Sequence, residues 1–176
     1  MDTETGRERI EAGAERLAAL AGKYMAFQLA EEIFGLAILE VREIIGMMEI
    51  TRMPRTPAFV RGVINLRGKV IPVVDLRLQF GMPACEATEQ TVIIVVHCEV
   101  HGRPLTMGVL VDRVLEVLHV PAGQIEPPPD LGGAAEEGSF ILGVGKANQR
   151  VVFLLDIARV LSAQDASAVG DALADA

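Results

Sequence analysis

The sequence has little of the aromatic, thiol and hydroxyl chemistry from which many functional sites are built. Its 176 residues include no Trp, one Tyr and six Phe, so it lacks the aromatic platforms on which single-stranded nucleic acid stacks. Its two cysteines, Cys85 and Cys98, are too few to imply a disulfide framework. No Ser, Cys or Thr stands in a pattern that predicts a nucleophile beside a His and an acid. These shortages favour a binding module over an enzyme.

Long apolar segments and excess positive charge are also missing. No window of eighteen apolar residues occurs, and the charged N-terminal stretch does not resemble a secretory signal. We therefore expect a cytoplasmic protein without direct membrane insertion. The net charge of −8 disfavours binding to nucleic acid, which needs a basic field.

Metal ligands are scarce as well. His97, Cys98 and His101 lie close together in the sequence, but a closed zinc site needs four converging ligands. Because neighbouring residues of a strand point to opposite faces, His97 and Cys98 cannot both reach one ion easily. We predict no metal and no cofactor.

Positive charge is nevertheless concentrated in one part of the chain. Residues 39–82 contain seven Arg or Lys against four Asp or Glu, a local excess of three positive charges. This window forms either a solvated basic face or a docking surface for an acidic partner, where charge would mainly steer encounter.

Short apolar runs separated by turns predict a mainly β fold. Residues 62–76, GVINLRGKVIPVVDL, place two Val- and Ile-rich runs on either side of Arg67, Gly68 and Lys69, which is typical of a β-hairpin. The segment ILGVGKANQRVVFLLDIARVL repeats this plan of strand, turn, apolar strand, Asp and short helix. The repeat predicts two similar small barrels. Two further segments, Ala37–Ile45 and Thr56–Arg61, are predicted to be a short helix and a single helical turn.

The segment TPAFVRGVINLRGKVIPVVDLRLQFG, residues 56–81, closely resembles the chemotaxis coupling proteins of the CheW family. The resemblance extends over about residues 23–162, through KYMAFQLAEEIFGLAILEVREII on one side and TVIIVV, MGVLVDRVLEVL and ILGVGKANQRVVFLLDIARVL on the other. It implies two five-stranded SH3-like β-barrel subdomains packed together, with short helices. The expected subdomains are about 23–35 with 45–85, and 86–155. Residues 1–22 and 163–176 are expected to be a leader and a tail outside this domain.

The resemblance also implies a function without catalysis. Proteins of this family are adaptors that couple chemoreceptors, the methyl-accepting chemotaxis proteins, to the histidine kinase CheA. They bind the cytoplasmic tip of the receptor and the regulatory domain of the kinase, so a cytoplasmic protein recruited to membrane-associated receptor arrays is expected.

The resemblance assigns partner contact, or the geometry beneath it, to five positions: Val41, Glu43, Gly62, Arg67 and Val117. It further implies an ion pair between Arg67 and Glu43 that crosses the two subdomains. A purely structural role remains open at four of these positions. In the structural alternative, Arg67 is only a solvated turn residue and Val41 and Val117 are core residues. Gly62 then serves only to permit a close backbone approach.

Three functions remain to be distinguished. The first is the receptor–kinase adaptor. The second is the same fold serving another chemosensory pathway, such as pilus motility or second-messenger output. The third is an unrelated enzyme or nucleic-acid module built on small barrels, because a fold alone does not fix function.

Overall fold

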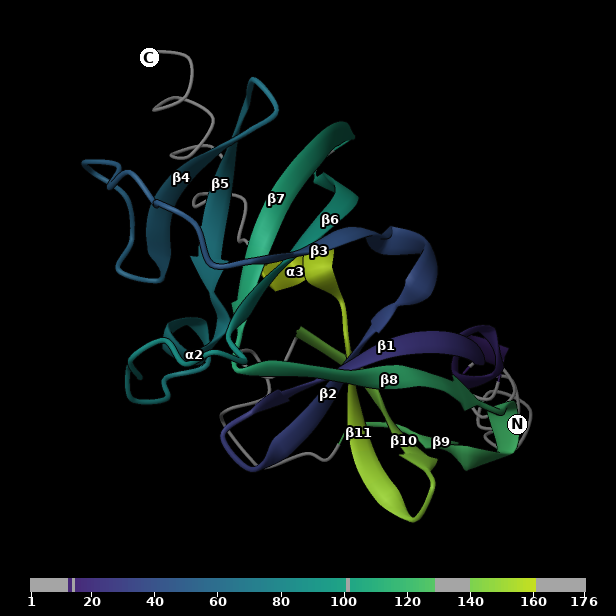
Figure 1. Ribbon diagram of the computed structural model, residues 1–176. Helices are drawn as coiled ribbons and strands as arrows, with labels where there is room; N and C mark the ends of the chain where they lie inside the picture. Colours follow the sequence, from purple (N-terminus) through teal and green to yellow (C-terminus); the bar gives the residue numbers. More distant parts are fainter. Residues whose placement is uncertain (1–12, 14, 101, 129–139, 161–176) are drawn as a thin grey trace.

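Two β-sheets make up most of the computed structural model, which describes residues 13, 15–100, 102–128 and 140–160 (Figure 1). The six-stranded sheet has the strand order β8-β1-β2-β11-β10-β9. Its strands are β1 (Gly22–Leu29), β2 (Glu32–Ala37), β8 (Arg113–Val120), β9 (Ile125–Glu126), β10 (Ile141–Ala147) and β11 (Arg150–Leu155).

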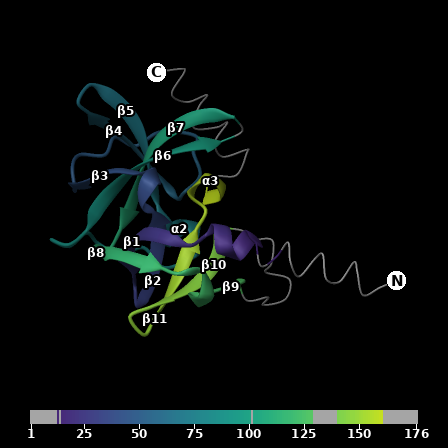
Figure 2. The ribbon, with the colours of Figure 1, turned by 90° about the vertical axis from the view of Figure 1, so that its right-hand side faces the viewer.

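The five-stranded sheet has the order β3-β6-β7-β5-β4. Its strands are β3 (Val41–Gly46), β4 (Val60–Leu66), β5 (Lys69–Asp75), β6 (Val92–Val100) and β7 (Arg103–Val111). The two sheets form two lobes, one above the other in Figure 2. The fold is thus mainly β with two strand-rich halves, as the sequence predicts, although β9 gives one half a sixth strand.

The helices are short. They are η1 (Ile38–Glu40), α2 (Leu76–Gln79), η2 (Ala122–Gln124) and α3 (Ile157–Val160), and residues 15–19 are also helical. Among the described residues, no helix combines the length and apolar character that crossing a membrane demands. Most of the predicted leader, and the whole predicted tail, lie outside the described residues.

The predicted repeat is present in three dimensions. In each lobe an antiparallel hairpin, β4–β5 or β10–β11, leads into a short helix, and its second strand pairs in parallel with a strand from elsewhere in the chain. Asp75 and Asp156, 81 positions apart, begin these helices, and the carboxylate of each accepts a hydrogen bond from a backbone N–H two residues later. Carboxylates at this position satisfy N–H groups that have no partner within the helix.

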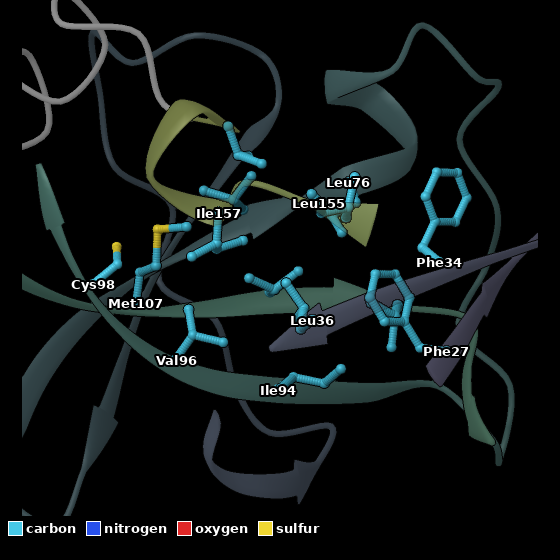
Figure 3. Close-up of a cluster of buried hydrophobic side chains, with 14 of the residues drawn as sticks. Phe27, Phe34, Leu36, Leu76, Ile94, Val96, Cys98, Met107, Leu155 and Ile157 are labelled. Carbon is cyan, nitrogen blue, oxygen red and sulfur yellow. The ribbon is translucent and has the colours of Figure 1, made fainter. Parts of the chain in front are cut away.

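A shared hydrophobic core joins the two lobes (Figure 3). Phe27 and Leu36 of the six-stranded sheet pack in one cluster with Ile94 and Met107 of the five-stranded sheet, and all four side chains are fully buried. Leu76 of α2 joins the same cluster. Burying each such side chain stabilises the fold by about 1.5–3 kcal/mol. The two lobes therefore depend on one another.

Two of the sequence predictions of helix are wrong. Within Ala37–Ile45 only η1 is helical. Ala37 ends β2, and the residues from Val41 onward belong to β3, which pairs with β6 from Val41↔Val96 to Gly46↔Val92. Thr56–Arg61 is a turn that leads directly into β4 at Val60. In β3 the β-branched side chains are used in strand pairing, which overrides the helical spacing. In the second segment the cap-like Thr56 and Pro57 are followed by a turn, and Val60 pairs with Val74 of β5.

Sheet membership also groups the strands differently from the expected subdomains. Strands β1 and β2, within residues 22–37, belong to the sheet of β8–β11, whereas β6 and β7 join β3–β5. The parallel pairing of β2 with β11 brings the beginning and the end of the domain together.

Candidate functional site

The site begins with a bidentate ion pair on the five-stranded sheet. The Nη1 and Nη2 atoms of Arg67 donate to Oε1 and Oε2 of Glu43, at 2.8 and 2.9 Å. Glu43 lies in edge strand β3, and Arg67 lies in the turn between β4 and β5, next to the opposite edge strand. The pair therefore closes the sheet on itself. The predicted contact is present, but the expectation that it crosses the two subdomains is wrong, because both residues belong to the same sheet.

Local backbone geometry fixes Arg67 in this position. Arg67 and Gly68 are the two central residues of the turn and both have positive φ, 53° and 87°. The Gly68 N–H donates to the side-chain oxygen of Asn65 at 2.9 Å, which closes the turn. Two-residue hairpin turns of this kind match the twist of the flanking strands. Arg67 is thus held at a projecting tip.

Exposure limits how much this ion pair can stabilise the fold. The Arg67 side chain is 75 % exposed and the Glu43 side chain 28 % exposed. Ion pairs in such settings contribute about 0–1 kcal/mol. Two of the five guanidinium N–H donors are used by Glu43, so three remain available to a partner.

Gly62 has a clear structural role beneath this site. Its φ is +144°, and a Cβ added there would lie 2.1 Å from the backbone oxygen of Thr51. Thr51 and Val63 exchange backbone hydrogen bonds of 2.8 Å, which tie the segment after β3 to β4. Because no side chain fits in this space, Gly62 allows the sheet to close.

The two valines have different environments. Val41, at the start of β3, is half-buried and packs against the shared core. Val117 is 47 % exposed and lies in β8, an edge strand of the other sheet, opposite Met25. The structure therefore brings Glu43 and Arg67 together, places Gly62 and Val41 in the same lobe, and leaves Val117 on the other lobe.

Three exposed apolar side chains near Glu43 are not predicted by the sequence reasoning. Leu39 is 95 % exposed on η1, and Ile44 and Met47 are each 39 % exposed in or just after β3. Exposed apolar side chains that lie close together in the chain mark a candidate docking surface. The sequence does carry a signal for this surface, because Leu39 and Ile44 each stand beside a Glu. The prediction of a helix in this segment placed these residues incorrectly.

A second, more buried ion pair joins the two lobes. Arg77 of α2 donates through Nε to Oδ1 of Asp112 at 2.7 Å, and its Nη2 contacts Oδ2. Asp112 lies between β7 and β8 and also accepts from the backbone N–H of Ala30 at 2.8 Å. The hydrogen bonds from Arg77 are the main cause that holds the pKa of Asp112 below its usual value.

The described residues offer little reactive chemistry. They contain no group of three or more His, Cys, Asp or Glu side chains placed to hold a metal ion. Burial, with a smaller effect of the Glu40 and Asp156 carboxylates, raises the pKa of the Cys98 thiol to about 11. Cys98 is therefore protonated at neutral pH and is a poor nucleophile.

Comparisons with known proteins point to one family. The family model described as the CheW-like domain matches residues 23–165. Chemotaxis protein CheW of Klebsiella aerogenes is 35 % identical over 163 residues, which are 90 % of this chain and 95 % of the relative. Chemotaxis protein CheW of Rhizobium meliloti is 40 % identical over 144 residues, which are 82 % of this chain and 90 % of the relative.

A third relative and a solved structure agree. Protein FrzA of Myxococcus xanthus is 33 % identical over 141 residues, which are 79 % of this chain and 84 % of the relative. The crystal structure of scaffolding protein TtCheW from Thermoanaerobacter tengcongensis is similar with a TM-score of 0.71 and 34 % identity, covering 83 % of this chain and 91 % of that one.

Proposed function

The chain belongs to the CheW family of non-catalytic chemotaxis adaptors, and from this premise we propose that it binds a chemoreceptor tip and a CheA-type kinase at the same time. The observation that supports this proposal most is the family match over residues 23–165, which includes both lobes. The proposed kinase contact is with its regulatory domain. Simultaneous binding would make kinase activity depend on the state of the receptor and would recruit the protein to membrane-associated arrays.

The five-stranded lobe offers one contact surface. Arg67 projects from its turn with donors to spare, and the exposed Leu39 and Ile44 lie on η1 and β3 next to its partner Glu43. Apolar area gives a partner something to bury, and a fixed guanidinium gives direction to the contact. In this proposal Glu43 orients Arg67, while Val41 and Gly62 maintain the strand geometry beneath the contact.

The six-stranded lobe offers a second contact surface around Val117. Glu116, Val117 and His119 of β8 line a groove of about 580 Å³ with Asn148 and Gln149 of the β10–β11 turn. An exposed Val beside polar groups is suited to a contact with a mixed apolar and polar partner surface. Two separate surfaces on two lobes are what an adaptor needs.

The Arg67→Ala variant tests the first surface. We expect affinity for the receptor fragment or for the kinase regulatory domain to fall about tenfold, because a fixed charged contact is lost. The melting temperature should hardly change, because the exposed ion pair contributes so little to folding. Calorimetric titration of each purified partner, together with a thermal melt of each variant, measures both quantities.

Lys69→Ala is the matched control. It removes a positive charge from the same hairpin, at an exposed residue two positions further along, and should leave both affinities within about twofold. Unchanged partner affinity in Arg67→Ala, with a large loss of stability, would reject this assignment.

A different chemosensory pathway is the alternative output. The chain is similar to FrzA as well as to proteins named CheW, so the fold is compatible with more than one signalling system. Binding assays with kinases from separate chemosensory systems distinguish the two outputs, because an adaptor of one system should prefer its own kinase.

A further inference from the structure

We infer that the segment between β3 and β4 forms a binding groove for a short acidic peptide, apart from the five residues discussed above. Arg52, Arg55 and Arg61 line one groove of about 550 Å³. The backbone of the segment between β3 and β4 is the blue loop beside β4 in Figure 1. No Asp or Glu is among its lining residues. The net charge of the protein is −8, so the three guanidinium groups make the local charge of this groove opposite in sign to that of the whole protein.

The arginines have few internal partners. Arg61 is 41 % exposed on its side chain, and its Nε lies 3.9 Å from the carboxylate of Asp75. Asp75 is already engaged in capping α2 and is itself buried. Arg52 and Arg55 are exposed and make no ion pair within the described part of the chain. The charges of Arg52 and Arg55 are thus available to a ligand, and Arg61 is held only by one long contact with Asp75.

Two of these arginines, Arg61 and Arg55, lie at irregular positions of the backbone. Arg61 is the extra residue of a β-bulge in β4, where the pairing with β5 shifts between Val60 and Gly62. Bulges re-aim a side chain. The corresponding bulge in β10, between Ile141 and Gly143, contains Leu142, so the bulge itself does not require an arginine. Arg55 has a φ of +61°, a conformation that is uncommon for residues other than Gly and that often marks a functional position.

The backbone of the groove is conformationally restricted. Pro54 and Pro57 lie in its wall, and the hydroxyl of Thr56 donates to the backbone oxygen of Met53 at 2.9 Å. Prolines fix φ, so the segment loses little further freedom when a ligand binds. Guanidinium groups form strong charge-assisted hydrogen bonds with carboxylates.

A peptide fits this site better than a larger polyanion. Ile50 and Met53, which are half-buried, add apolar area to the groove, which suits an apolar side chain flanked by carboxylates. Nucleic acid or an anionic membrane would extend beyond the groove and meet the negative charge of the rest of the protein. A short segment rich in Glu with a central Leu experiences mainly the local positive field.

Fluorescence anisotropy with a labelled peptide, Glu-Glu-Leu-Glu-Glu, tests the inference on the full chain. The neutral peptide Gln-Gln-Leu-Gln-Gln is the ligand control. We expect the acidic peptide to bind at low salt, and Arg52→Ala or Arg61→Ala to weaken binding about five- to tenfold. Arg103→Ala, an exposed arginine of the same sheet outside the groove, should change affinity less than about twofold.

Arg55→Gly separates binding from folding. Glycine adopts positive φ without strain, so this variant should lose peptide affinity while its melting temperature holds or rises. Equal binding of both peptides, an equal loss with Arg103→Ala, or absence of binding would overturn the inference. Arginine-dependent binding to phosphatidylglycerol vesicles or to inorganic phosphate that exceeds binding to the peptide would also overturn it. Neither receptor nor kinase is used, so the result is independent of the proposed partners.

Discussion

Glu43 explains why the sequence pattern of β3 was mistaken for that of a helix. The Glu43 side chain is half-buried in β3, at a position where strand alternation predicts an apolar residue. Its carboxylate binds Arg67 across the closed sheet. The prediction of a helix rests instead on Ile38, Val41 and Ile45, which would share one helix face with Arg42 and Glu43 off it. The wrong prediction of a helix over Ala37–Ile45 thus has its origin in a candidate site residue, as expected where local rules conflict with function.

Gly62 has a structural role that affects which substitutions can test its part in binding. The resemblance places it among the partner contacts, and a bulky substitution such as Gly62→Arg would be expected to disturb binding. The structure shows that even a Cβ meets the Thr51 backbone at 2.1 Å, so this variant perturbs folding first.

Gly62→Ala should therefore be destabilising by at least about 2 kcal/mol, from backbone strain at positive φ together with the clash. Gly123→Ala is the control, because a Cβ there meets nothing within 4 Å and its φ is not in the strained range. Urea unfolding of both variants measures the difference. Equal stability of Gly62→Ala and the wild type would contradict the tight approach described here.

The two cysteines should react very differently. Cys85 is exposed, whereas Cys98 is buried and its pKa is raised to about 11. At pH 8 only about one Cys98 thiol in a thousand is then ionised, so a disulfide reagent should modify Cys85 quickly and Cys98 only on unfolding. Absorbance of the released thiolate follows both phases. Two thiols reacting at one rate in the native protein would contradict this assignment.

At the level of elements, the hairpins are the best predicted part of the structure. The segment around Arg67 and Gly68 combines turn residues with β-branched runs, and it forms β4 and β5 as predicted. The repeat in β10–β11 is also confirmed, down to the carboxylate that caps each following helix. Such features depend on neighbours in the sequence, so the sequence alone reveals them.

The Arg77–Asp112 contact is an element-level feature that local patterns cannot reveal, because it joins α2 to the β7–β8 junction across 35 positions. The pKa of Asp112 is lowered in the folded protein from an ordinary value of 3.8, so the folded state binds this proton less readily than the unfolded chain. The stabilisation is therefore complete above about pH 4 and is lost as the pH falls below that value.

Asp112→Asn should be less stable than the wild type by about 1–3 kcal/mol at pH 7, because a charged hydrogen bond is replaced by a neutral one. The difference should shrink as the pH falls from about 4 toward 2. Urea unfolding at a series of pH values measures it, with Glu126→Gln, a partner in an exposed ion pair, as the control. A difference that is constant over this pH range would contradict the role of the ion pair.

At the scale of the whole molecule, the sequence predicts two strand-rich halves but not which strands form each half. Strand β2 joins the distant β11 in parallel, and this pairing has no local signal. The shared core makes such an exchange favourable, because Phe27, Leu36 and Ile94 pack in one cluster. Of the candidate site, the sequence predicts the Arg67–Glu43 contact through its motif but misses the apolar surface around Leu39.

Receptor-dependent regulation of a kinase tests the central claim most directly. The rate of ATP consumption by a CheA-type kinase is measured with a receptor cytoplasmic fragment, with and without this chain, and with its Arg67→Ala variant. The account predicts that the chain alone consumes no ATP, that adding it makes the kinase rate depend on the receptor fragment, and that Arg67→Ala weakens this dependence. A kinase rate that is the same with and without the chain would contradict the account.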